Sequence, residues 1–211
     1  MTLPAERAPT SVPATQARGR PRSVPAATAV LDAAYGLSAR HGLRGATIQA
    51  IASESGVSRM TIYKWWESRL HLLIDAYMRQ ATLALPLSES APPLPAIHAH
   101  AQRYLVALRG DLGQVQMAVL AECLAQHGNS DLFVERYLSQ RRRLGIKIIR
   151  RGQADGSVLS SRPASALYDQ IFGTMFYRSQ FGLAPLDGPF VRSLVEATLM
   201  GTSPNPGGSM A

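Results

Sequence analysis

The sequence predicts an all-α protein, and three features of its pattern lead to that prediction. The 14 prolines leave residues 26–85 and 96–162 free of proline, and long helices can form in these two stretches because proline clashes within a helix. Apolar residues recur there at helical spacing, and no stretch shows the sustained alternation that is typical of a strand. Glycines stand at the ends of the periodic segments, where helices often stop. We therefore expect about nine helices and no sheet.

Changes in composition divide the chain into two helical domains with irregular segments around them. Residues 1–24 are rich in Pro, Ala, Thr and Arg and predict a disordered basic arm, while residues 202–211 predict a disordered tail. Residues 25–84 predict a small three-helix domain, residues 85–94 a linker, and residues 95–201 a helical bundle. The helices of the bundle are expected at about 95–109, 112–127, 130–153, 163–182 and 187–200.

The stretch TIQAIASESGVSRMTIYKWW, residues 47–66, predicts two short helices joined by a tight turn. Thr47 can cap the first helix and Ser58 the second. Gly56 tolerates the left-handed backbone that a sharp turn between them requires. Ile62 and Trp66 are four residues apart, so both should face the core. These features are typical of a helix-turn-helix.

The other side chains of the second short helix should point away from the core. They are Arg59, Met60, Tyr63 and Lys64, which together form a basic and aromatic surface. A helix of this width fits the major groove of DNA. A preceding helix at about 26–41 should pack across the pair, and a following helix, from Arg69 to about residue 83 or 85, should lead out of the domain and act as a lever.

Together these motifs resemble the DNA-binding domain of TetR-family repressors over about residues 25–80. The residues that carry the resemblance are Thr47, Ile51-Ala52, Gly56-Val57-Ser58, Thr61-Ile62-Tyr63, Trp66, Ser68 and Arg69. Three positions depart from the usual pattern: Met60 replaces a small residue or proline, Trp65 a histidine or tyrosine, and Arg69 a lysine. These departures leave the predicted fold unchanged but bear on which bases are read.

The predicted DNA contacts fall into two groups. Base edges are expected to be met by Arg59, Met60 and Lys64. Contacts to the DNA backbone are expected from Thr47, Thr61, Tyr63, Trp65 and Arg69. The resemblance also implies that the connector before Thr47 approaches the DNA backbone, so that Arg44 is either a phosphate contact or simply exposed.

The basic arm offers a further route to DNA. Its segment Arg18-Gly19-Arg20-Pro21-Arg22 resembles the core of an AT-hook, in which Arg18, Arg20 and Arg22 would lie along a narrow minor groove. The alternative is a solvated tail that adds only non-specific attraction to phosphates. Either alternative raises the DNA affinity and its sensitivity to salt.

Charge and cysteine content restrict the class of protein. The formal charge of +8 favours a polyanionic partner. Cys123 is the only cysteine, which excludes an intrachain disulfide and a cysteine-based zinc site, and its expected role is a small core residue. The start of the chain lacks a signal-peptide pattern, and no apolar run is long enough to cross a membrane. We therefore expect a cytoplasmic protein without cofactor, metal or membrane contact.

The last two predicted helices carry broad apolar stripes that a small bundle would not fully use. Pairing these helices with their copies in a second subunit would form a four-helix interface. The sequence Phe172-Gly173-Thr174-Met175-Phe176-Tyr177-Arg178 also resembles the dimer-forming region of one TetR C-terminal subfamily. The predicted interface residues are Tyr168, Ile171, Phe172, Met175, Leu194, Thr198 and Leu199.

Apolar residues inside the predicted bundle line either a ligand pocket or a packed core. The candidates are Tyr104, Met117, Leu120, Cys123, Phe133, Tyr137, Phe172 and Met175, and the resemblance favours an apolar effector among some of them. Two other groups are interpreted as structural. The histidines His98 and His100 diverge on a helix, which argues against a metal site. The arginines Arg141-Arg142-Arg143 and Arg150-Arg151 are expected on a solvated face.

The sequence favours a transcriptional repressor that binds a palindromic operator on double-stranded DNA as a homodimer and is released by a small effector. An effector-independent or activating regulator with the same DNA domain is the first alternative. An enzyme is disfavoured because the chain has no nucleophile elbow, phosphate loop, zinc spacing or catalytic triad pattern. A helical adaptor that uses the turn motif for protein contacts is the remaining alternative.

Overall fold

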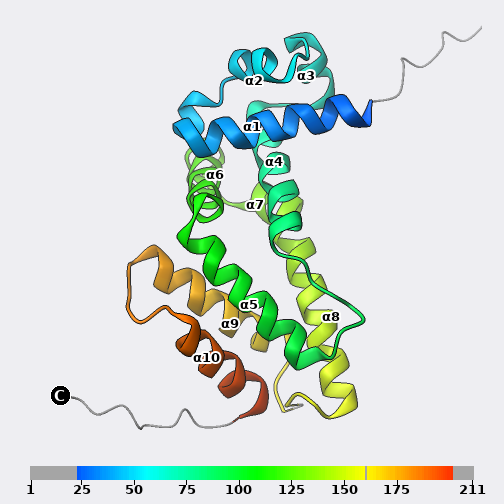
Figure 1. The fold of residues 1–211 in the computed structure, drawn as a ribbon, viewed down its shortest axis with the longest axis vertical. Coiled ribbons are helices and arrows are strands. Elements are labelled where there is room, and N and C mark those ends of the chain that lie inside the picture. The colour runs from blue at the N-terminus through cyan, green and yellow to red at the C-terminus, as the bar shows by residue number, and fades with distance from the viewer. Residues whose placement is uncertain (1–22, 160, 202–211) are drawn as a thin grey trace, which may run out of the picture.

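The fold was analysed in a computed structural model, which describes residues 23–159 and 161–201 (Figure 1). All regular structure in this part of the chain is helical. The elements are α1 (Val24–Gly45), α2 (Ile48–Ser55), α3 (Arg59–Trp65), α4 (Arg69–Ala84), α5 (Pro93–Arg109), α6 (Asp111–His127), α7 (Asp131–Phe133), η1 (Val134–Leu138), α8 (Ser139–Asp155), α9 (Ala164–Gln180) and α10 (Gly188–Met200). Because α7, η1 and α8 follow one another without a break, the described residues form nine helices, as predicted.

The N-terminal helices form one end of the molecule. In Figure 1 the long helix α1 crosses beneath α2 and α3, and α4 leads away from them toward the other helices. Helix α1 contacts α2, α4 and α6. Its regular part ends at Gly42, whose φ of 66° is left-handed, and one further turn follows before Thr47. The predicted end at residue 41 therefore marks a real break in the helix.

The remaining helices form the other end of the molecule. Helices α5, α8, α9 and α10 pack on one another, and α6 joins them to α1 and α4. Each agrees with its predicted range to within two or three residues. The exception is internal: the predicted helix over 130–153 contains one wide π-helical turn at η1. Such turns often occur at functional sites.

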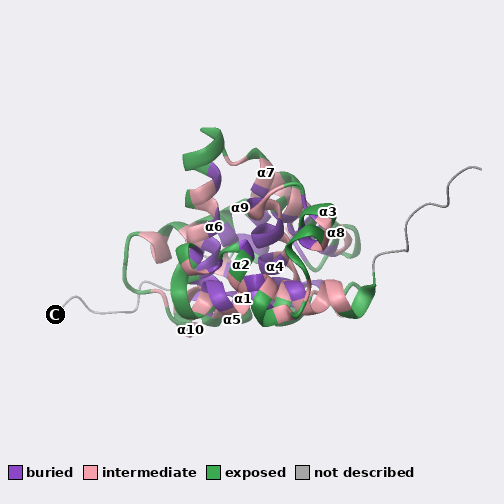
Figure 2. Ribbon diagram, turned by 90° about the horizontal axis from the view of Figure 1, so that it is seen from above, coloured by how far each residue is buried: buried purple, intermediate pink, exposed green. Residues whose placement is uncertain are grey.

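The interior is one continuous apolar cluster that extends through both ends of the molecule. Figure 2, seen from above, shows buried residues among the overlapping helices in the middle of the view. Helix α4 supplies much of it, because Leu72, Leu73, Ile74 and Tyr77 are all fully buried. Cys123 is buried with a free thiol, in agreement with its predicted core role. No helix in the described part of the chain is long and apolar enough to cross a membrane.

The predicted arm residues Arg18, Arg20 and Arg22 lie outside the described residues. The predicted interface residues are described, and the structure corrects their assignment: Tyr168, Ile171, Phe172, Met175, Thr198 and Leu199 are buried within the subunit, and Leu194 is half-buried. The apolar stripes of α9 and α10 are used by the subunit's own core, packed against α5 and α8.

Candidate DNA-binding surface and effector cavity

The helix-turn-helix is held in shape by side-chain caps at both helices. The Thr47 hydroxyl accepts a hydrogen bond from the Ala50 amide at 3.1 Å and caps α2. Gly56 ends α2 with a left-handed φ of 68°. The Ser58 hydroxyl accepts from the Thr61 amide at 3.2 Å and caps α3. These local bonds fix the angle at which α3, the candidate recognition helix, leaves the domain.

One face of the recognition helix is buried and the other is open. Ile62 is fully buried, and so is Trp66 directly after the helix. The open face carries four exposed side chains, Arg59, Met60, Tyr63 and Lys64. Thr61 and Trp65 are half-buried at its edge, and Arg44 and Thr47 are exposed nearby in sequence. The structure therefore separates the core face from the outward face where the sequence predicted the division.

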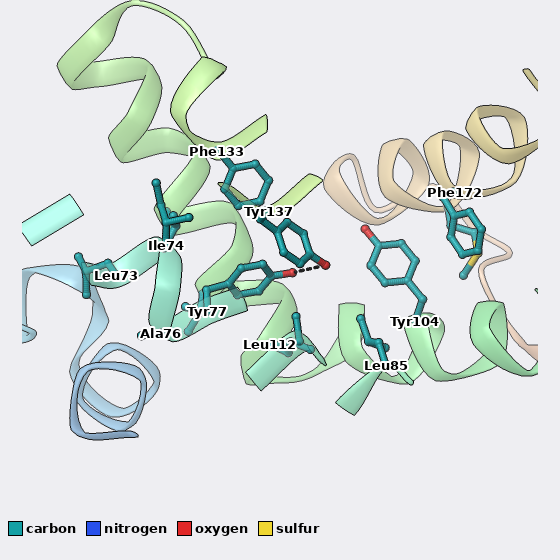
Figure 3. Close-up of a cluster of buried hydrophobic side chains, with 14 of the residues drawn as sticks. Leu73, Ile74, Ala76, Tyr77, Leu85, Tyr104, Leu112, Phe133, Tyr137 and Phe172 are labelled. Carbon is teal, nitrogen blue, oxygen red and sulfur yellow. Dashed lines mark hydrogen bonds between the residues drawn. The ribbon is translucent and has the colours of Figure 1, made fainter. Parts of the chain in front are cut away.

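A cavity of about 310 Å³ lies among α5, α6, η1, α8 and α9. Six of its 17 lining residues are phenylalanine or tyrosine. Figure 3 shows four of these rings, Phe133 and Tyr137 on one side and Tyr104 and Phe172 on the other, with Tyr77 beside Tyr137. Hydroxyls and one amide link the walls. Tyr77 donates to Gln116 Oε1 at 3.0 Å and lies 3.3 Å from the Tyr137 hydroxyl. Gln116 in turn donates to the Tyr104 hydroxyl at 3.4 Å.

The predicted pocket residues divide into two sets. Five of them, Tyr104, Leu120, Phe133, Tyr137 and Phe172, line this cavity. Cys123 and Met175 instead belong to the packed core, and Met117 is half-buried outside the lining. Because wall and core residues have the same apolar character, helical spacing could not separate them.

Twelve of the 17 lining residues were not among the predicted pocket residues, and two of the twelve, Arg141 and His100, bear most on the chemistry of the cavity. Arg141 was expected on a solvated face, but only 6% of it is exposed and it lines the cavity, so that prediction is wrong for this residue. Its neighbour Arg143 is exposed as expected. His100 is also buried against the cavity, with its ring centroid 5.1 Å from that of Phe172.

Burial sets the ionisation of the cavity walls. Desolvation, helped by the positive charges of Arg141 and Arg103, lowers the pKa of His100 to about 3, so this imidazole is neutral at neutral pH. Desolvation also raises the pKa of Tyr104 and of Tyr168, so both phenols stay protonated. The cavity lining thus contains a buried positive charge, Arg141, beside neutral groups that can donate and accept hydrogen bonds, and an Arg142–Asp169 ion pair nearer the surface.

Comparisons with known proteins agree with this two-part architecture. Residues 30–76 match the family model described as bacterial regulatory proteins, tetR family, and residues 96–198 match the tetracyclin repressor-like C-terminal domain. The chain belongs to the TetR family of transcriptional regulators. Its relatives are DNA-binding regulators with a helix-turn-helix, not enzymes.

Individual relatives of this TetR-family regulator cover most of the chain. An uncharacterised HTH-type transcriptional regulator of Bacillus subtilis, YdeS, is 28% identical over 84% of this chain and 90% of its own length. The crystal structure of the TetR family transcription regulator SCO0332 is 25% identical, with a TM-score of 0.74 over 85% of this chain and 99% of its own. A TetR regulator from Agrobacterium tumefaciens, 23% identical over 84% of this chain and 93% of its own, shares the fold with a TM-score of 0.66.

Two polar joints connect the two parts of the TetR-family regulator. At the first, which we call the Asp75 joint, Asp75 accepts hydrogen bonds from Arg136 at 2.9 and 2.8 Å and from the Trp66 indole at 2.9 Å. The carboxylate raises the pKa of Arg136 through these bonds. Trp66 directly follows the recognition helix, whereas Arg136 is in η1 next to Tyr137, which lines the cavity.

The second connection, the Arg69 joint, begins at the first residue of α4. The Arg69 guanidinium donates to the Leu43 carbonyl at 2.7 Å and the Ala46 carbonyl at 3.4 Å, and it forms an ion pair with Glu122 of α6 at 2.7 Å. Arg69 was predicted to contact the DNA backbone. In this structure Arg69 thus connects the two parts, while 29% of its side chain is exposed, and its contact with the DNA backbone stays a prediction.

Proposed function

We propose that this TetR-family regulator represses transcription by binding an inverted-repeat operator as a homodimer, and that an effector in the aromatic cavity lowers its affinity for DNA. The observation that carries the proposal is the Asp75 joint. Arg136 and Tyr137 are consecutive residues of η1, so one wall of the cavity is bonded through Asp75 to the residue that ends the recognition helix.

On the DNA side, the open face of α3 enters the major groove. Arg59, Met60 and Lys64 meet base edges, while Thr61 and Tyr63 contact the DNA backbone beside them. The exposure of these side chains and the two capping bonds of the turn support this assignment. Two copies of the helix, about 34–36 Å apart in a dimer, would read half-sites one DNA turn apart.

The subunit contact is proposed on the outer face of α9 and the end of α10. Gly173, Tyr177 and Phe181 are spaced four residues apart, so they lie on one stripe, and the two aromatic side chains are 57% and 68% exposed. A Cβ at Gly173 would meet open space, and Gly173 also lines the aromatic cavity, so this end of the stripe borders the opening of the cavity. Met200 is also exposed on α10. An apolar stripe of this size is typical of a surface that a second subunit covers.

Effector action follows from a difference in affinity between two conformations. A ligand that fits the cavity only when η1 or α6 shifts would favour a conformation in which the recognition helices no longer match successive grooves. The operator affinity would then fall by the ratio of the effector's affinities for the two conformations. Helix α4 supports this route because both polar joints end on it.

The DNA assignment is tested by mobility-shift titration on duplexes that the full-length protein selects from a random pool. Tyr63→Ala and Lys64→Ala are each expected to weaken binding while the dimer persists. Lys147→Ala is the matched control, since Lys147 is the only other lysine and pairs with Glu89 far from α3 in sequence. Unchanged binding by both Tyr63→Ala and Lys64→Ala would contradict the placement of the recognition helix.

Specificity is tested on the same duplexes against random DNA. If Arg59 pairs with a guanine, Arg59→Ala should reduce the discrimination by about 1–3 kcal/mol and affect binding to random DNA much less. An equal loss on both kinds of DNA would reassign Arg59 to a phosphate contact. A reporter gene behind the selected operator separates repression from activation, because loss of the regulator raises expression in the first case and lowers it in the second.

The dimer assignment is tested by light scattering on the full chain. Tyr177→Arg should convert the dimer to a monomer, because it places a charge in the centre of the proposed stripe. Val106→Arg is the control, since Val106 is an exposed apolar residue of α5 outside that stripe. A dimer that survives Tyr177→Arg would refute the proposed contact.

A further inference from the structure

Arg141 occupies an unusual position for a charged residue. It lies on α8, 6% of it is exposed, and it forms part of the wall of the aromatic cavity. Its guanidinium donates to the Leu85 carbonyl at the end of α4, and it also lies within hydrogen-bonding range of the Tyr137 hydroxyl. Both of these partners are neutral, so the positive charge itself is not compensated by them.

Within the described residues, none of the ion pairs includes Arg141. The only carboxylate in the cavity lining is Asp169, which is bound by Arg142 at 2.7 and 2.5 Å near the surface. Buried charges in proteins are normally paired, because the cost of removing an ion from water is offset only by a close opposite charge. Arg141 is a buried cation without such a close opposite charge among the described residues.

A second polar group in the same wall also lacks a partner. The Nδ1 atom of His100 is buried and makes no hydrogen bond within the described part of the chain. His100 is close enough to Arg141 for the guanidinium to help lower the pKa of the imidazole. A neutral imidazole can donate one hydrogen bond to an acceptor in the cavity. Arg141, an uncompensated cation, and His100, with an unused polar atom, therefore line the same partly open cavity.

We propose that the cavity binds an organic carboxylate, whose carboxylate group pairs with Arg141 and accepts a hydrogen bond from His100, and whose apolar body lies among the rings of Tyr104, Phe133 and Phe172. This inference rests on the proposed effector function and specifies its ligand class. A guanidinium suits the role because its fork of donors matches a carboxylate. The volume of about 310 Å³ is at the small end of ligand pockets, so a compact acid is expected.

The test uses two pairs of probes that differ only in charge: 2-naphthoate with 2-naphthamide, and octanoate with octanamide. Binding to the full-length protein is measured by titration calorimetry at pH 7.5. At least one acid should bind ten-fold or more tightly than its amide. The two pairs distinguish a flat aromatic body from an extended aliphatic one. Amides that bind as tightly as their acids, or the failure of both acids to bind at 1 mM, would overturn the proposal.

Substitutions then locate the charge. Arg141→Met should reduce the acid-to-amide ratio to less than three-fold, whereas Arg150→Met, on the exposed side of the same helix, should leave it unchanged. Arg141→Lys keeps a positive charge without the fork and should retain part of the preference, which provides a test if Arg141→Met does not fold. A preference for the acid that survives both substitutions would overturn the assignment to Arg141.

Mobility shifts with the acid present separate this inference from the proposed function. An acid that binds through Arg141 without releasing DNA would leave the carboxylate site standing and refute effector control. An amide that releases DNA as well as its acid does would support effector control and overturn the carboxylate site.

Discussion

Replacing Asp75 with asparagine should destabilise the protein clearly, because this carboxylate holds two parts of the molecule at once. Its side chain is 17% exposed and accepts two bonds from Arg136 and one from the Trp66 indole. Asparagine keeps one carbonyl oxygen, so one or two of the three donors lose their acceptor, and each remaining bond loses the negative charge of the carboxylate.

The expected magnitude follows from the number of bonds and their exposure. A hydrogen bond to a charged group contributes about 1.5–3 kcal/mol when it is well buried. The Arg136 side chain is 35% exposed. Solvent screening therefore reduces the contribution of the Arg136–Asp75 pair to stability toward the values of about 0.2–1 kcal/mol found for surface pairs. We expect Asp75→Asn to lower the free energy of unfolding by about 2 kcal/mol in total. For a chain of this length that corresponds to a fall in Tm of about 4–8 °C.

The assay is urea denaturation followed by tryptophan fluorescence. The two tryptophans of the chain are Trp65 and Trp66, so the signal reports on the end of the recognition helix. Asp32→Asn is the matched control, because Asp32 pairs with Arg79 of the same helix α4 but is 46% exposed, and it should cost no more than about 1 kcal/mol.

A double-mutant cycle of Asp75→Asn with Arg136→Gln completes the test. The two residues are in direct contact, so their effects should be non-additive by about 1 kcal/mol or more. Additive effects would refute the view that this joint stabilises the contact between the two parts. So would a loss in the free energy of unfolding for Asp75→Asn that is no larger than the loss for Asp32→Asn.

Three further outcomes are expected from buried groups. Because the pKa of His100 is lowered to about 3, the unfolded chain binds a proton at this residue near pH 6.5, whereas the folded chain does not. The contribution of His100 to the free energy of unfolding is therefore full above pH 6.5 and falls by up to about 1.4 kcal/mol per pH unit toward pH 3. Urea denaturation at several pH values should find this dependence weaker in His100→Phe. Gly145→Ala should lower Tm, since a Cβ there would overlap the Tyr168 ring, and overpacking of this kind costs about 1–3 kcal/mol. Cys123 should resist alkylation at pH 7.5 until urea unfolds the protein, because the thiol is buried and burial raises its pKa. Rapid labelling of Cys123 by iodoacetamide in the folded protein would contradict this prediction.

The parts of the fold that were predictable from sequence depend on neighbours along the chain. Thr47 and Ser58 are caps because a hydroxyl before a helix reaches the amides of its first turn. Gly56 ends α2 because it can adopt a left-handed backbone. Proline and glycine positions fixed the helix ranges in the same way. Each of these rules acts within about four residues, so one sequence is enough to apply it.

The parts that sequence could not predict depend on contacts across the fold. Arg141 belongs to an arginine-rich segment, and only the packing of α8 against α9 and α5 determines which of those arginines is buried. Arg69 finds its ion-pair partner, Glu122, 53 positions later. For α9, the apolar stripe is broad enough to serve the core or a second subunit, and the choice depends on how the other helices cover it. The charge of a residue and the periodicity of its segment carry no information about which distant residues it contacts in the fold.

The two polar joints together explain why a shift in the cavity wall should reach the DNA. Arg69 and Asp75 are six residues apart on α4, which places them about 9 Å apart along the helix and about 120° apart around it. Arg69 is held by α6 through Glu122, and Asp75 by η1 through Arg136, and both α6 and η1 contribute walls to the cavity. A ligand that displaces these two walls unequally must therefore rotate or tilt α4.

Under the proposed function, rotation of α4 would move the recognition helix, because both joints also hold the DNA-binding end. The Asp75 joint includes Trp66, and the Arg69 joint includes the carbonyls of Leu43 and Ala46, in the segment between the break at Gly42 and α2. Coupling of this kind is reciprocal: if an effector lowers the affinity for DNA by some factor, DNA must lower the affinity for the effector by the same factor. Asp75→Asn should reduce both factors equally, because it removes the shared bond rather than a contact to either ligand.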